Sequence, residues 1–140
     1  MKKVGMIMLL ALIAVACNKN QKAVKTLDGK WNVTSWVDKY DGMSEEYITD
    51  GVSISMTFND CKLKDDEFCT LILSETFDEE TDAYSYEYRV AGYGTSLELR
   101  DTDYPSELTY MKIEELTKDK LILMIDYGDG ETTTITLEKE

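Results

Sequence analysis

Apolar and polar residues alternate one by one over most of the chain after residue 26. The alternation is clearest over residues 52–58 (VSISMTF), where apolar side chains fall on one face and hydroxyl side chains on the other. A period of two is typical of a β-strand with one face buried. We predict eight segments with this pattern: residues 27–37, which begin with a turn, and residues 52–58, 68–77, 83–91, 95–101, 108–116, 120–127 and 131–138.

Short turns join most of these segments, and no segment between them has the period of a helix. Gly128, Asp129 and Gly130 indicate a tight hairpin before the last strand. The pattern therefore predicts an all-β fold, an antiparallel up-and-down barrel of eight strands. Such a barrel is either filled by side chains or wide enough for one small ligand. A β-sandwich is the alternative, because strand spacing alone does not separate the two architectures.

Two stretches depart from simple alternation. In the first strand Trp31 and Val37 share one face, whereas Trp36 falls on the other face and is expected near a rim. Residues 38–51 form the longest connection, which we predict to be a loop with one helical turn starting at Ser44. This loop could act as a lid or could simply be solvated.

The chain carries 28 acidic and 15 basic residues, a net charge of −13. This charge repels nucleic acids and anionic lipid headgroups, so a nucleic-acid partner is not expected. The chain has no histidine, which excludes His-based general bases, Ser-His or Cys-His pairs and His-ligated metals. No two acids stand out as a catalytic pair, and residues 126–131 lack the spacing of a calcium loop. We therefore expect neither an enzyme nor a resident metal or cofactor.

The first residues have the features of a bacterial lipoprotein signal. Lys2 and Lys3 precede an apolar run at residues 4–15, which is too short to span a membrane. The small residues before Cys17 resemble a lipobox. This resemblance implies that residues 1–16 are a signal peptide and that Cys17 is acylated and anchored in a lipid bilayer. An ordinary secretory signal and a buried apolar helix are the alternatives.

The segment after the cysteine is polar. Residues 17–26 contain several lysines, and we predict a flexible tether before a barrel domain at residues 27–140. Three apolar residues at this junction could form a plug across one end of the barrel: Ala23, Val24 and Leu27.

Two further cysteines, Cys61 and Cys69, remain once Cys17 is assigned to the lipid. A disulfide between them is expected outside the cytoplasm. A metal site is the alternative, although two thiols alone give it little support.

The triplet Gly29-Lys30-Trp31 matches the Gly-x-Trp that opens the first strand of lipocalins. With the lipobox, the polar tether and the strand ending Met56-Thr57-Phe58, the chain resembles the small lipocalin-like lipoproteins of the Bacteroidota. The resemblance implies an eight-stranded barrel, possible binding of a small apolar molecule and no catalytic residues.

The same resemblance carries two further expectations. Surface-displayed lipoproteins of this group often have an acidic run after the cysteine, which this chain lacks. An outer-membrane location facing the periplasm is therefore expected, with surface display as the alternative. In lipocalins the motif's Trp packs under an Arg from the end of the barrel, but Arg89 and Arg100 both lie outside the last strand of this chain.

The inward faces of the predicted strands suit an apolar ligand whose polar end meets tyrosine hydroxyls. The candidate pocket residues are Trp31, Ile54, Met56, Phe58, Leu71, Leu73, Tyr84, Tyr86, Tyr88, Leu97, Leu99 and Leu123. A filled core is the alternative. In that case the outer surface, with Trp36, Tyr40 and Tyr47, would bind a protein or a glycan.

Overall fold

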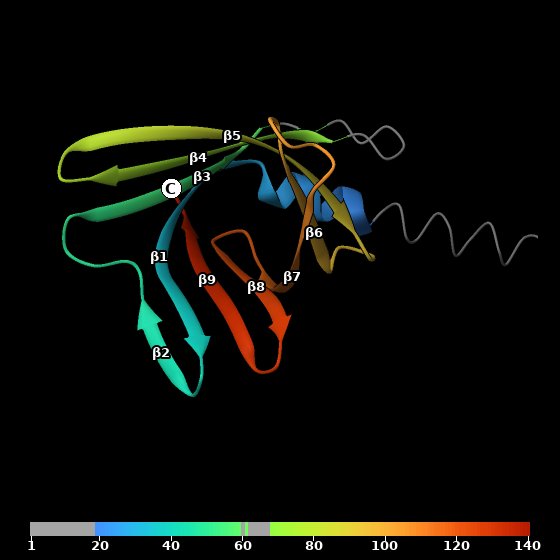
Figure 1. Cartoon of the computed structure of the whole chain (residues 1–140). Helices are drawn as coiled ribbons and strands as arrows, with labels where there is room; N and C mark the ends of the chain where they lie inside the picture. Colours follow the sequence, from blue (N-terminus) through green and yellow to red (C-terminus); the bar gives the residue numbers. More distant parts are fainter. Residues whose placement is uncertain (1–18, 60, 62–67) are drawn as a thin grey trace, which may run out of the picture.

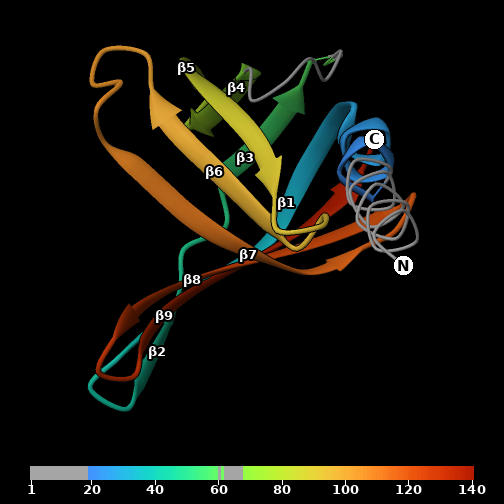
Figure 2. The ribbon, with the colours of Figure 1, turned by 90° about the vertical axis from the view of Figure 1, so that its right-hand side faces the viewer.

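The computed structural model describes residues 19–59, 61 and 68–140. Its strands are β1 (Gly29–Tyr40), β2 (Met43–Glu46), β3 (Val52–Phe58), β4 (Cys69–Phe77), β5 (Glu80–Ala91), β6 (Ser96–Asp101), β7 (Leu108–Leu116), β8 (Lys120–Gly128) and β9 (Glu131–Lys139). All of the pairings between them are antiparallel. Strands β3 to β9 pair in chain order, and β1 pairs with both β3 and β9 (Figures 1 and 2). The structure is thus a closed eight-stranded up-and-down barrel with β2 as an added strand, which confirms the predicted fold and excludes the β-sandwich.

The predicted alternation places the core correctly in most strands. In β3 the residues Ile54, Met56 and Phe58 are buried, and in β9 the buried residues are Thr133, Ile135 and Leu137. Strands β3 and β7 have the predicted bounds, and the other predicted strands differ from the observed ones by a few residues at their ends. This agreement follows from local geometry, because alternate side chains of any strand face opposite sides.

A bulge in β1 changes which of its residues face inward. Val33 lies opposite Leu137, and the register then shifts so that Ser35 lies opposite Thr136 and Trp36 opposite Ile135. One extra residue, Thr34, is accommodated, and every later side chain moves to the other face. The prediction that Trp36 shares the outer face is therefore wrong, and its indole points into the barrel.

Residues 38–51 are not a loop with a helical turn. Strand β1 continues to Tyr40, and β2 folds back on it with Tyr40 opposite Met43. Asp41 and Gly42 have φ values of 48° and 73°, as the central residues of a type I′ hairpin turn require. The Asp-Gly pair at 41–42 is itself a sequence signal for such a turn.

The end of the barrel where β1 begins is covered by a helix. Residues 19–27 are helical, whereas the sequence suggested a flexible tether up to residue 26. Ala23, Val24 and Leu27 are buried, and the indole Nε1 of Trp31 donates a hydrogen bond to the Leu27 carbonyl at 2.7 Å. Burial of these three side chains stabilises the helix, so the predicted plug is confirmed.

Within the described residues, no helix is both long enough and apolar enough to cross a membrane. Cys61 and Cys69 are joined by a disulfide, which confirms the predicted pair and closes the connection between β3 and β4. Cys17 lies outside the described residues, so its acylation remains a prediction.

Candidate functional site

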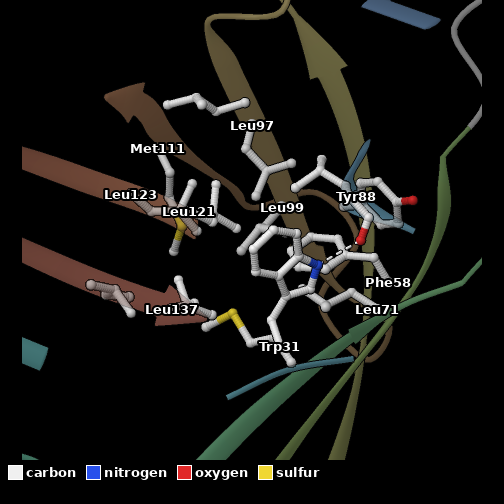
Figure 3. Packing of buried hydrophobic residues seen from close by; sticks show 14 of the residues in the cluster. Trp31, Phe58, Leu71, Tyr88, Leu97, Leu99, Met111, Leu121, Leu123 and Leu137 are labelled. Carbon is white, nitrogen blue, oxygen red and sulfur yellow. Dashed lines mark hydrogen bonds between the residues drawn. The ribbon is translucent and has the colours of Figure 1, made fainter. Parts of the chain in front are cut away.

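The half of the barrel next to the helix holds a cluster of buried side chains, and Figure 3 shows part of this packing around Trp31, Phe58 and Tyr88. Phe58 and Tyr88 pack edge to face with their ring centroids 5.0 Å apart, and the Tyr88 hydroxyl donates to the Asn59 carbonyl at 3.1 Å. Five predicted pocket residues belong to this core and are fully buried: Trp31, Phe58, Tyr88, Leu97 and Leu123. None of the five lines either of the two cavities described below.

The other half of the barrel is hollow. A cavity of about 370 Å³ is lined by Trp36, Met56, Leu71, Leu73, Tyr86, Leu99, Arg100, Asp101, Glu107, Thr109, Met111, Ile125 and Tyr127. Five of these residues were among the predicted pocket residues: Met56, Leu71, Leu73, Tyr86 and Leu99. Met111 and Ile125 also line this cavity but are not among the predicted pocket residues. Simple alternation placed Trp36 on the outer face, because it does not account for the bulge in β1.

A second cavity of about 240 Å³ adjoins the first. It is lined by Trp36, Asp38, Tyr47, Ile54, Leu73 and Glu75. Trp36 and Leu73 line both cavities, so the two spaces share a wall. The second cavity exists because β1 and β3 separate: their pairing extends only from Gly29 opposite Phe58 to Asn32 opposite Ser55. Beyond the bulge, β1 pairs with β2 instead.

The three tyrosines of β5 have different surroundings. Tyr86 lines the larger cavity, and its pKa is raised by burial and by the nearby Asp101 and Tyr84. Tyr84 is 45% exposed and lines neither cavity, whereas Tyr88 belongs to the filled core. Alternation gave all three the same face, but only the position along the barrel axis decides which one meets a cavity.

Tyr47 links the segment after β2 to the wall of the barrel. Its hydroxyl donates a hydrogen bond to Glu75 Oε1 at 2.6 Å. Because this carboxylate accepts the hydrogen bond and carries a negative charge, the pKa of Tyr47 is raised above its ordinary value. The Tyr47 ring lies against Trp36, with centroids 5.9 Å apart and planes tilted by 54°. These contacts hold two aromatic rings beside the second cavity.

Glu46 holds the bulged part of β1 in place. Its carboxylate accepts hydrogen bonds from the Ser35 hydroxyl at 2.7 Å, the Trp36 backbone N–H at 2.7 Å and the Ile48 backbone N–H at 3.1 Å. Loss of hydration acts to raise the pKa of Glu46, but the hydrogen bonds outweigh it and the net pKa is lowered. A side chain of β2 thus fixes the backbone that carries Trp36.

Asp38, like Trp36, is turned inward by the bulge in β1. Thr133 of β9, which is buried, donates a hydrogen bond to Asp38 Oδ1 at 2.5 Å. Among the residues that the structure describes, no group of three or more Cys, Asp or Glu side chains is placed to hold a metal ion.

No protein-family model matches the chain, and no curated protein sequence matches it. Among solved structures, it is similar to the crystal structure of a lipocalin-like protein from Bacteroides uniformis ATCC 8492. The two share 20% sequence identity with a TM-score of 0.44, over 82% of this chain and 99% of that chain. The assignment of an eight-stranded barrel rests on the strand pairing of the chain itself.

Proposed function

We propose that the chain is a lipid-anchored envelope protein whose barrel binds a small, mainly apolar molecule in its hollow half. The observation that carries this proposal is the cavity of about 370 Å³ inside the barrel wall. Its volume falls within the range of small-molecule sites, roughly 300–1,000 Å³. Leu, Ile and Met side chains from several strands line it, together with polar groups such as Asp101 and Thr109. Sites that bind and orient a small molecule combine these two kinds of group.

The two halves of the barrel would have different roles. The filled half, with Trp31 and Phe58 at its centre, supplies apolar burial that stabilises the fold. The hollow half then leaves space that a ligand can occupy without displacing the core. This division supports binding inside a preformed barrel.

Acylation of Cys17 would also orient the barrel. Cys17 precedes the helix at residues 19–27 by two positions, and this helix covers the filled end. A lipid on Cys17 would therefore hold the filled end near the bilayer and leave the hollow end facing away from it. Several acyl chains at about 0.8 kcal/mol per buried CH₂ would make this attachment stable. We propose the periplasmic face of the outer membrane as its location.

Native mass spectrometry of the chain from Asn18 onward, produced in the periplasm of its host, tests ligand binding. We expect a small-molecule adduct that is released on denaturation. Met111→Trp should remove the adduct because Met111 lines the cavity, whereas Met124→Trp, on the outer side of β8, should keep it. A folded wild-type protein with no adduct, and with no uptake of hydrophobic dyes, would refute the proposal.

Metabolic labelling of the full chain with an alkyne fatty acid tests the anchor. The wild-type protein should be labelled and should remain with the membrane fraction. Cys17→Ser should lose both properties. The double change Cys61→Ser and Cys69→Ser should retain both, and equal labelling of all three proteins would contradict acylation at Cys17.

A second candidate function is suggested by exposed apolar side chains near the hollow end. Tyr40, Met43 and Tyr47 of the β1–β2 region and Phe77 and Tyr84 of the β4–β5 hairpin are all exposed. The two regions are adjacent, since the Asp78 amide bonds to the Gly51 carbonyl at 3.4 Å. Such a surface could bind a protein or a glycan. Crosslinking in the host should then yield a partner that is lost in Phe77→Ser and kept in Met111→Trp.

A further inference from the structure

We propose that the molecule bound in the hollow half carries an organic ammonium group, which Asp38 and Glu75 hold beside the rings of Trp36 and Tyr47. This inference rests on the proposed small-molecule function and specifies the chemical class of the ligand. Its apolar chain would extend into the larger cavity, past the wall that Trp36 and Leu73 contribute to both spaces.

The first argument is the state of the two carboxylates in the smaller cavity. Among the described residues, Glu75 receives one hydrogen bond, from Tyr47 to Oε1, and Asp38 receives one, from Thr133 to Oδ1. Both residues are half-buried. A carboxylate has about four acceptor positions, so each retains acceptor capacity that a bound cation could use.

The second argument is the lack of a basic partner for either carboxylate among the described residues. Within the described part of the chain, Asp38 and Glu75 form no ion pair with a lysine or an arginine. The larger cavity adds two more acids, Asp101 and Glu107, which also form no such pair there. An apolar space with several uncompensated negative charges disfavours a carboxylate ligand and favours a cation.

Arg100 does not supply the missing positive charge. It touches the larger cavity, but its Nε donates to Glu87 Oε2 at 2.6 Å and its Cζ lies 3.9 Å from the ring centroid of Phe68. Alternation places Arg100 and Glu87 on the outer face of β6 and β5, where they lie opposite each other. The guanidinium is therefore engaged outside the barrel.

The third argument is the pair of aromatic rings. Trp36 and Tyr47 lie 5.9 Å apart, and both line the cavity that contains the two carboxylates. Cations bind favourably against the faces of Trp and Tyr, and ammonium groups are recognised in this way. Carboxylates and aromatic rings around one small space therefore match an alkylammonium head, and the leucine and methionine side chains beyond it match an alkyl chain.

The test compares three probes with the same chain and different heads: dodecyltrimethylammonium, dodecanol and dodecanoate, each below its micellar concentration. Binding to the chain from Asn18 is measured by calorimetry and by quenching of Trp36 fluorescence, with Trp36→Phe as the control for the signal. We expect the ammonium probe to bind at least about tenfold more tightly than the alcohol. The carboxylate should bind most weakly.

Charge-removing variants assign the effect to the proposed residues. Glu75→Gln and Asp38→Asn should each weaken binding of the ammonium probe severalfold and leave dodecanol binding unchanged. Glu138→Gln removes the same charge from the outer side of β9 near the filled end and should change neither. Urea unfolding first shows that each variant has the denaturant midpoint of the wild type. If Asp38→Asn does not fold, the result for Glu75→Gln is sufficient for the test.

The outcomes separate the two proposals. If dodecanol or dodecanoate binds as tightly as the ammonium probe, or if Glu75→Gln has no effect, the ammonium inference is overturned and ligand binding stands. If none of the three probes binds, both the inference and the proposed function fail.

Discussion

Lys139 places its ammonium nitrogen 5.1 Å from the ring centroid of Trp31. The same nitrogen donates a hydrogen bond to the Thr26 carbonyl at 2.9 Å. The resemblance to lipocalins implies an arginine in this position, but Arg89 lies in β5 and Arg100 in β6. A lysine near the end of β9 makes the contact instead, and it joins the last strand, the first strand and the helix at the filled end.

We predict that Lys139→Met lowers the free energy of unfolding by about 1–2 kcal/mol, because it removes a cation–π contact and a charged hydrogen bond. Lys139→Arg should retain most of the stability. Lys118, whose side chain is 90% exposed, provides the control, and Lys118→Met should change stability by less than about 0.5 kcal/mol. Urea unfolding measures all three, and equal losses at Lys139 and Lys118 would refute the role of Lys139.

A pair of enlarging substitutions tests whether one half of the barrel is hollow. Leu97→Phe adds volume to the filled half, where Leu97 is fully buried, and should cost about 1–3 kcal/mol of stability through overpacking. Leu73→Phe adds similar volume beside both cavities and should cost less than about 1 kcal/mol, since space is present. Thermal or urea unfolding gives both values, and equal costs would mean that the two halves are packed alike.

Acid should loosen the β1–β2 hairpin through Glu46. Its pKa in the folded protein lies below the ordinary value of 4.5, so its contribution is present above that value and is lost as the pH falls through the lower folded pKa. NMR amide shifts of Trp36 and Ile48, whose N–H groups donate to this carboxylate, should follow the titration. Glu46→Gln should abolish it. Glu45→Gln should not, because Glu45 bonds to Tyr40 instead.

The disulfide between Cys61 and Cys69 should contribute roughly 2–3 kcal/mol by restricting the unfolded chain. Cys61→Ser combined with Cys69→Ser should lower the free energy of unfolding by that amount. Reduction of the wild-type protein should have the same effect, and intact mass should rise by about 2 Da as two protons are gained. A reduced protein as stable as the oxidised one would show that the bond is dispensable.

The sequence by itself determined the strands and most of their buried faces. Ile54, Met56 and Phe58 could be assigned to the core because a period of two is a property of the backbone. The hairpin at Asp129 and Gly130 and the disulfide between Cys61 and Cys69 could also be predicted, because each involves residues that are close in the sequence. The hairpin at Asp41 and Gly42 could be predicted in the same way, because an Asp-Gly pair favours a two-residue hairpin turn.

Only the tertiary structure decided where the barrel is filled and where it is hollow. The bulge between Val33 and Ser35 exists in the pairing of β1 with β9, about a hundred residues away, and it alone turns Trp36 and Asp38 inward. Whether Tyr86 lines a cavity and Tyr88 fills a core depends on the summed volume of side chains from all the strands at that level of the barrel. Alternation predicts which face of a strand a side chain occupies, but the packing of side chains around the closed barrel sets the space that remains inside it.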